Sequence, residues 1–256
     1  MAARPPGAAR KRTLFPRDGF LYDPYLAAPR QSQTGSKVLI PLRAGEPTRI
    51  ENALGLARPV VRWTPSEDPG SGTEIQVEAA VFARFDIRER WDLDAADFRF
   101  GFPVVRRVGD LAWRIHAYHL TSHLGDEFIE RTGAAVVPYH LEEIAAGLSW
   151  DVDDGSRVYG EAAAAVYASR PTGNGRVQAG FEWVGSKGPA GLSPYFAVDL
   201  QSRNEQDWSP GKTVAAGVAY GRDVRLALEV FHGRDPQTQF LDDNIFYLSI
   251  GLSVFF

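Results

Sequence analysis

The last segment of the chain alternates between large apolar residues and small or polar ones. Its apolar positions are Phe246, Leu248, Ile250, Leu252, Val254 and Phe256. The positions between them are Tyr247, Ser249, Gly251, Ser253 and Phe255. A period of two residues is that of a β-strand, because successive side chains of a strand point to opposite faces. The segment therefore predicts a strand with one apolar face and one that is mostly small or polar.

The same alternation recurs along the chain and predicts an all-β protein. It is seen in twelve segments, at residues 36–43, 50–64, 74–86, 91–107, 109–123, 138–151, 156–168, 174–184, 192–204, 209–220, 223–234 and 244–256. Helical periodicity is not convincing anywhere. Residues 141–149 could form a short helix, but Gly147 and the neighbouring strands favour a strand.

Short and long connections alternate between these segments. The tight turns at 221–222 and 152–155 alternate with longer loops such as 235–243 and 124–137. Bacterial outer-membrane barrels have short periplasmic turns and longer extracellular loops, and a strand that stops on a terminal Phe resembles their closing strand. We therefore expect an antiparallel up-and-down transmembrane β-barrel of about 12 strands, with Phe256 in the periplasm. The alternative is a soluble barrel or sandwich with its charged face outward and its apolar face as the core.

Charge in the middle of the strands lies on one face only. This face carries Glu78, Arg84, Asp97, Arg99, Arg114, His116, Glu161, Glu182, Asp199, Arg225 and Glu229. A barrel of about 12 strands has a narrow interior that side chains can largely fill. Because the charges are of both signs, we expect them to pair as a stabilising network in a filled lumen.

Composition excludes several classes of protein. The formal net charge of −4 gives no strong attraction for polyanions, so we expect no nucleic-acid partner. Cysteine is absent, which excludes disulfides and thiolate metal sites. No run approaches 18 apolar residues, so no transmembrane helix is expected. A mean hydropathy of −0.23 does not argue against a barrel, in which alternating hydrophobicity averages out.

The first 35 residues precede the first predicted strand. Residues 1–12 are rich in Ala, Pro and Arg and are typical of a disordered tail. No apolar stretch follows their basic residues, so a secretory signal is not visible, although an outer-membrane protein must be exported. Residues 13–35 could be an ordered periplasmic lead-in or a plug. We therefore divide the chain into residues 1–35, a tail and lead-in, and residues 36–256, the barrel.

One predicted strand carries three of the five histidines. His119, Thr121 and His123 share the face that would meet lipid near the extracellular boundary, and Ser122 lies on the other face. A His and a hydroxyl two residues apart on a strand can hydrogen-bond, so that the His acts as a base toward the hydroxyl. Outer-membrane phospholipase A and the lipid A deacylases carry a His-x-Ser of this kind on the outer barrel surface. His119-Leu120-Thr121 resembles it, with Thr in place of Ser.

Two carboxylates follow the same strand. Asp126 or Glu127 could orient His119 or His123, as the third member of a catalytic triad does. In a purely structural alternative, these groups only hydrogen-bond the long loop that follows the strand. We expect no metal site, because His119 and His123 are about 13 Å apart along a strand, too far to share one ion. No cofactor-binding motif is present.

The same residues carry a family resemblance. The run Tyr118–Phe128, the opening Asp18–Tyr22 and the pair of stretches at 159–162 and 231–234 resemble an uncharacterised bacterial family, the domain of unknown function numbered 1207. The resemblance covers roughly residues 14–256. It implies a barrel-like fold and an envelope location, and it implies no activity. Many members would be expected to have Ser where this chain has Thr121.

These observations give two main hypotheses and a third, less favoured one. The first is a bacterial outer-membrane barrel with a filled, charged lumen and a structural, receptor-like or narrow solute-passage role. The second is a lipid esterase or deacylase with His119 as base and Thr121 or Ser122 as nucleophile. The third is a soluble β-protein that binds an apolar ligand. The expected partners are membrane lipid, lipopolysaccharide and the barrel-assembly machinery, through the strand that ends at Phe256.

Overall fold

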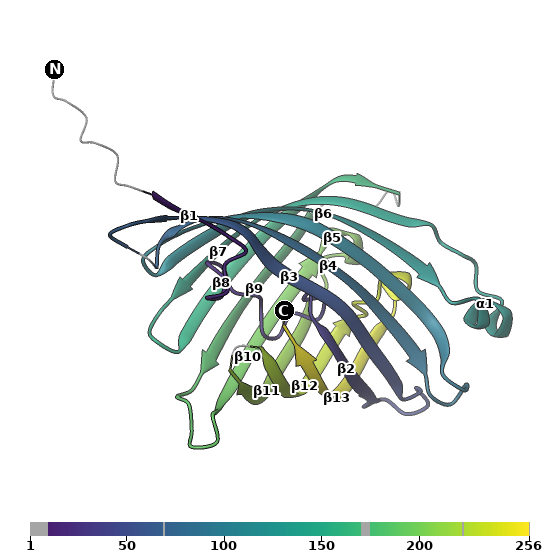
Figure 1. Cartoon of the computed structure of the whole chain (residues 1–256). Helices are drawn as coiled ribbons and strands as arrows, with labels where there is room; N and C mark the ends of the chain where they lie inside the picture. The colour runs from purple at the N-terminus through teal and green to yellow at the C-terminus, as the bar shows by residue number, and fades with distance from the viewer. Residues whose placement is uncertain (1–9, 69, 170–174, 222, 256) are drawn as a thin grey trace.

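The structure is a computed structural model that describes residues 10–68, 70–169, 175–221 and 223–255. Twelve antiparallel strands form a closed barrel (Figure 1). These strands are β2 (Thr34–Pro41), β3 (Arg49–Pro65), β4 (Gly72–Asp86), β5 (Asp92–Val108), β6 (Leu111–Leu124), β7 (Tyr139–Asp151), β8 (Ser156–Ala168), β9 (Gly175–Val184), β10 (Leu192–Arg203), β11 (Gly211–Tyr220), β12 (Val224–Arg234) and β13 (Asn244–Val254). A short strand β1 (Arg10–Leu14), a helix α1 (Asp126–Thr132) and two 3₁₀ turns, η1 (Asn204–Gln206) and η2 (Thr238–Phe240), complete it.

Each barrel strand pairs with its neighbours in sequence, and β13 pairs with β2 to close the wall. The predicted twelve-stranded barrel is confirmed, and its strand limits agree with those predicted to within two residues. Residues 141–149 lie in β7, as favoured. Two elements were not predicted. Helix α1 lies in the longest loop, and β1 includes Arg10 to Arg12, which the composition had assigned to a disordered tail.

Two separate segments, β1 and β2, pair with the same edge of β3. On the edge of β3 opposite β4, β2 covers residues 49–53 and β1 covers residues 61–65. Between them, the Thr34 hydroxyl donates to Gly55 O at 2.8 Å, and Phe15 N donates to Val60 O at 2.9 Å. The long β3 strand thus offers an uncovered edge that holds β1 in place, which explains why this basic segment forms a strand here.

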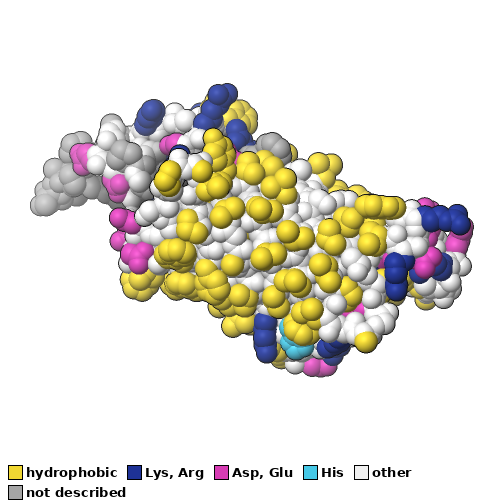
Figure 2. Space-filling model, turned by 90° about the horizontal axis from the view of Figure 1, so that it is seen from below, with side chains coloured by type: hydrophobic (Ala, Val, Ile, Leu, Met, Phe, Trp, Pro, Cys, Tyr) yellow, Lys and Arg dark blue, Asp and Glu magenta, His cyan; other side chains and the backbone are white. Residues whose placement is uncertain are grey.

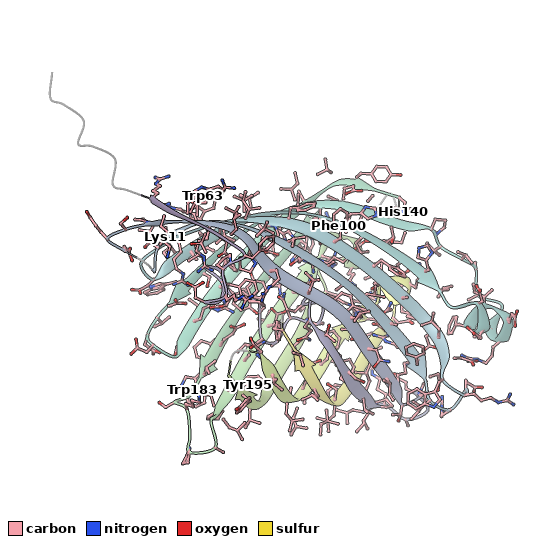
Figure 3. The ribbon with its side chains drawn as sticks, in the orientation of Figure 1. Lys11, Trp63, Phe100, His140, Trp183 and Tyr195 are labelled. Carbon is pink, nitrogen blue, oxygen red and sulfur yellow. The ribbon has the colours of Figure 1, made fainter. Side chains whose placement is uncertain are left out.

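The two ends of the barrel differ in their connections. At one end, which we call the tight-turn end, short turns such as 109–110 and 152–155 join the strands, and β13 ends there. At the other, the long-loop end, lie 125–138 with α1 and 235–243 with η2 (Figure 1). Figure 3 places Lys11 and Trp63 together near the tight-turn end and His140 toward the long-loop end.

The outer surface of the wall is apolar and the interior is polar. Phe98, Phe100 and Phe102 project outward and are 43–53% exposed, whereas Glu78 and Asp97 are buried inside. Figure 2 shows hydrophobic side chains spread over the wall, with charged ones gathered toward the two ends. The soluble alternative, with the apolar face as the core, is therefore wrong. Among the described residues, no helix is long and apolar enough to span a membrane.

We expect Gly101→Ala to lower the free energy of unfolding by about 1–3 kcal/mol, because overpacking a filled interior forces its neighbours to move. A Cβ at Gly101 would lie 2.5 Å from His116 Nε2 and 2.8 Å from Ala117 O. Gly160→Ala is the matched control, since its Cβ would meet only Gln178 O, at 4.0 Å. Urea unfolding in detergent micelles measures both variants, and equal stability of the two would contradict this packing.

Candidate functional site

The lumen of the barrel is occupied by the chain's own segment 15–33, which we call the plug. Side chains of the wall bind its backbone directly. Arg157 donates to Asp23 O at 2.9 Å and to Pro24 O at 3.0 Å, and Leu26 N donates to Glu182 Oε1 at 2.7 Å. Arg157 also pairs with Glu182. The plug therefore has its peptide groups satisfied by charged residues of the wall.

The far end of the plug is held at the long-loop end. Arg30 donates to Pro236 O at 3.0 Å and to Gln237 Oε1 at 2.8 Å, both in the loop before β13. Its guanidinium also lies 3.4 Å from Glu51 Oε2 and over the ring of Phe82. The plug thus ties the wall to the long loops as well as filling the middle of the barrel.

Two tyrosines of the plug meet the centre of the lumen. Tyr25 stacks on Tyr159 with ring centroids 3.8 Å apart, and its hydroxyl lies 2.7 Å from that of Tyr22. The Arg114 guanidinium lies 4.7 Å from both tyrosine rings of the plug. Burial raises the pKa of Tyr25 well above its ordinary value, so this hydroxyl stays protonated and able to donate.

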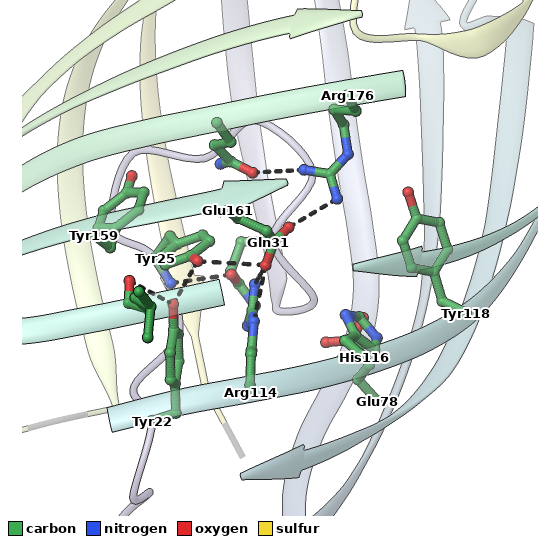
Figure 4. A network of polar contacts seen from close by, with 12 residues as sticks. Tyr22, Tyr25, Gln31, Glu78, Arg114, His116, Tyr118, Tyr159, Glu161 and Arg176 are labelled. Carbon is green, nitrogen blue, oxygen red and sulfur yellow. Dashed lines mark hydrogen bonds and ion pairs between the residues drawn. The ribbon is translucent and has the colours of Figure 1, made fainter. Parts of the chain in front are cut away.

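A ladder of alternating charges runs along the wall beside these tyrosines (Figure 4). Arg114 lies 2.6 Å from Glu161, which in turn lies 2.8 Å from Arg176. Arg176 also lies 2.7 Å from Glu143, and Tyr118 donates to the same carboxylate. Each ion is buried, and each has a partner of opposite charge, which is the condition for keeping charges in a closed interior.

The structure places the other predicted lumen residues in smaller clusters. Glu78 lies 2.8 Å from Arg99 and 3.1 Å from His116 Nε2. Arg84 pairs with Asp235 at 2.5 Å. These contacts join residues of the wall to each other and to the loop before β13.

The remaining predicted residues also face inward. Glu229 lies 3.1 Å from Lys37 Nζ, and Asp199 accepts from Gln178 at 2.7 Å. Arg225 differs from the rest, because in the described part of the chain it contacts no carboxylate and lies 4.0 Å from the Phe255 ring.

Sequence reasoning missed several members of this network. The missed residues are Lys37, Glu51, Glu143, Arg157, Arg176 and Asp235. Strand alternation could have found those on the strands, since each shares the inward parity of its strand. Asp235 lies in a loop, where no periodicity applies, so only the folded structure identifies it.

The space left in the lumen is divided by the plug. A cavity of about 940 Å³ opens at the tight-turn end and is lined by plug residues, including Asp18 and Asp23, and by turns such as 152–155. On the other side of the plug, beneath the long loops, the cavity has a volume of about 70 Å³. The lumen is therefore wide on one side and nearly filled on the other.

A second polar cluster lies on the outer surface, near the long-loop end of β6 and β7. His119 and Glu142 are opposite each other on these strands, and His119 Nδ1 lies 2.6 Å from Glu142 Oε1. Their side chains are 35% and 49% exposed. Phe100 packs beside the His119 ring, with centroids 6.3 Å apart. An imidazole–carboxylate pair thus faces outward, directly against the apolar band.

Thr121 is the next outward residue of β6, opposite His140 on β7. In the described residues no hydrogen bond joins the Thr121 hydroxyl to His119. Ser122 faces the lumen instead and donates to Asp97. The pairing of β6 with both neighbours is regular here, so no bulge turns Ser122 outward and it is not a nucleophile on this surface.

The carboxylates expected to orient the histidines lie elsewhere. Asp126 and Glu127 form the first turn of α1, and within the described chain neither bonds to His119 or His123. The orienting position beside His119 is taken by Glu142, because a cross-strand neighbour is closer than a residue beyond the strand end. His123 packs edge-on against Phe98. Among the described residues no group of three or more potential metal ligands is found.

We expect Arg157→Met to lower the free energy of unfolding by about 3–5 kcal/mol, because it leaves the Glu182 carboxylate buried without its partner. Adding Glu182→Gln should recover part of this loss, since the amide keeps an oxygen for Leu26 N and carries no charge. Urea unfolding of wild type, both single variants and the double variant gives the coupling energy. Strictly additive losses would show that the pair is not coupled.

Proteins of known structure resemble this chain in fold and not in sequence. No curated protein matches the sequence. Outer-membrane phospholipase A from Escherichia coli superposes with a TM-score of 0.58 at 10% identity, covering 89% of this chain and 93% of that one. A Salmonella typhi outer-membrane phospholipase dimer with bound calcium gives a TM-score of 0.61 at 10% identity, covering 91% and 94%. These similarities show that the fold is that of outer-membrane barrels.

Sequence comparison gives the family. Residues 8–256 match a family described as protein of unknown function, DUF1207. This is the family that the runs around Tyr118–Phe128 and Asp18–Tyr22 had indicated, and the match extends over nearly the whole length. The chain therefore belongs to the DUF1207 family.

Proposed function

We propose that the protein is a bacterial outer-membrane barrel that is closed by its own plug and acts at the membrane surface, in a structural or receptor-like role. The fold supports insertion in the outer membrane. The tight-turn end would face the periplasm and the long-loop end the exterior, as in other bacterial barrels. The outward His119 and Glu142 would then lie near the outer boundary of the bilayer.

One observation carries this proposal: the plug is bound to the wall by buried charged groups along its length. Arg157 and Glu182 hold its middle, and Arg30 anchors its far end to Gln237. A loosely held segment would leave its peptide groups to water. Here they bond to the wall, so displacing the plug would expose buried charges as well as peptide groups. This argues for a permanently closed lumen and against steady solute passage.

We expect the wild-type protein to give no steady single-channel conductance in a planar bilayer. A variant that begins at Thr34 keeps β2–β13 but lacks both β1 and the plug, and it should conduct steadily. The matched control lacks only residues 1–9 and keeps both β1 and the plug, so it should stay closed. Heat-modifiable mobility on SDS gels checks that each variant is folded. Steady conductance of the wild type would contradict a closed lumen.

A second candidate function is hydrolysis of lipid esters. It is favoured by the contact of 2.6 Å between His119 Nδ1 and Glu142 Oε1 on the outer face, with Thr121 two residues further along. Glu142 would fix the ring so that Nε2 is free to take a proton. Membrane phospholipid and lipopolysaccharide are the ester-bearing molecules that such a surface would meet.

The reaction would proceed in two steps. His119 Nε2 takes the Thr121 hydroxyl proton while the oxygen bonds to the ester carbonyl carbon, and the alcohol of the lipid leaves with that proton. Water then gives a proton to His119 and attacks the acyl-threonine ester. Fatty acid is released, and the proton returns to Thr121. Threonine is more hindered than serine as a nucleophile, so the rate would be low.

Fatty-acid release from phospholipid and from lipopolysaccharide, measured in detergent micelles, tests this second function. We expect His119→Asn and Thr121→Ala to reduce release by about 10²–10⁴-fold, the usual contribution of acid–base catalysis. Thr121→Ser should increase release, and Glu142→Gln should decrease it. His232→Asn is the control, because His232 is outward on β12, on a different part of the wall. Release that survives His119→Asn would exclude this site.

Assembly is a separate proposal. Strand β13 has an apolar outward face, and its edges pair with β12 and β2. This supports recognition of the last strand by the barrel-assembly machinery before closure. The terminal Phe256, on which the prediction also rested, lies outside the described residues.

A further inference from the structure

A row of basic and aromatic residues crosses five strands near the tight-turn end. The strand registers place Arg12 opposite Trp63, Trp63 opposite Thr73, Thr73 opposite Arg106 and Arg106 opposite Trp113. We call these five residues the arginine–tryptophan row. Directly paired positions on neighbouring strands point to the same face of a sheet. Trp113 is 41% exposed on the outer surface, so the row faces outward.

The next row toward the middle of the wall is wholly apolar. Its members, again directly paired, are Leu14, Val61, Ile75, Val104 and Ile115. Leu14, on β1, is 56% exposed. The arginine–tryptophan row therefore lies where an apolar surface changes to a charged one, which is the depth of the headgroups in a bilayer.

Within the part of the chain that the structure describes, the arginines of this row do not pair with acidic residues. Arg106 Nη1 donates to the neutral hydroxyl of Thr73 at 3.0 Å. In the described ranges, neither Arg106 nor Arg12 has a carboxylate within ion-pair distance. Arg10, on the same face of β1, adds a further positive charge below Arg12. This contrasts with the lumen, where nearly every arginine meets an acid.

We propose that the arginine–tryptophan row binds the headgroup of an anionic glycerophospholipid in the periplasmic leaflet. Neighbouring strands are about 4.8 Å apart, so Arg12 and Arg106 are about 14 Å apart across the surface. Trp63 and Thr73 lie between them, and Arg106 reaches toward Thr73, which places a positively charged residue on each side of Trp63. Guanidinium groups bind phosphate oxygens in bidentate geometry, and tryptophan rings settle at the membrane interface. The inference rests on the proposed orientation, with the tight-turn end in the periplasm.

The site explains what β1 contributes to the barrel. Arg12 and Leu14 belong to β1. Without this strand, the backbone N–H and C=O groups on this edge of β3 would face lipid without hydrogen-bond partners. The N-terminal segment thus has two functions on opposite sides of the wall: residues 15–33 fill the lumen, and β1 completes a lipid-binding surface.

The test compares phosphatidylglycerol with zwitterionic phosphatidylcholine on the folded full-length protein, with bound lipid counted by native mass spectrometry. We expect the wild type to retain phosphatidylglycerol preferentially. Each arginine near an anionic surface contributes roughly fivefold in binding, so Arg12→Gln with Arg106→Gln should lose about 25-fold of this preference. Arg12→Lys with Arg106→Lys keeps the charge and should retain most of it.

The matched control is Arg88→Gln with Arg90→Gln, which removes two exposed charges between β4 and β5 at the opposite end. It should leave the preference unchanged. Equal retention of both lipids by the wild type would overturn the proposal. So would a preference that survives loss of both row arginines, or one that falls equally in the control. Conductance and fatty-acid release depend on other residues, so their outcome is separate from this one.

Discussion

The buried polar groups of the lumen impose one condition on which the rest of this structure depends: a charge or peptide group taken out of water needs a partner within the protein. The ladder from Arg114 through Glu161 and Arg176 to Glu143 meets it by alternating sign. Wall and plug meet it together, because Arg157 satisfies carbonyls of the plug and Glu182 satisfies its amide at Leu26. Removing one member would leave others uncompensated.

The same requirement explains why β1 and β2 share one edge of β3. A strand edge facing lipid carries unpaired N–H and C=O groups, which is costly where water is absent. Strand β3 is much longer than β2, so its edge would be bare toward the tight-turn end. β1 covers residues 61–65 of that edge, and the chain passes through the lumen between the two segments. Filling the lumen and completing the wall are therefore one structural solution.

Polar side chains on the lipid face stand out against this background, because nothing about closing the barrel requires them. His119 and Glu142 satisfy each other near the long-loop end. Arg12 and Arg106, near the tight-turn end, have no acidic partner among the described residues. Both groups border the apolar band, where the two membrane interfaces would lie. The His119–Glu142 pair has its partner within the protein, which is compatible with a catalytic or a structural role. The arginines have no acidic partner in the described residues and are therefore available to bind an external anion.

The sequence by itself determined the barrel: strand number, limits and facing all follow from a period of two, since burial alternates with every residue of a strand. It also placed Glu78, Arg84 and Arg114 on the inward face, and His119 and Thr121 on the outward one. Only the tertiary structure decided which charges meet, because partners such as Glu161 and Arg176 or Arg84 and Asp235 are brought together by strand register and loop packing. It also replaced Asp126 and Glu127 by Glu142 beside His119, since contact across strands depends on register. The sequence left residues 13–35 open between a lead-in and a plug, and it did not predict β1. The structure decided both, because these short segments have no periodicity of their own and the wall around them sets their conformation.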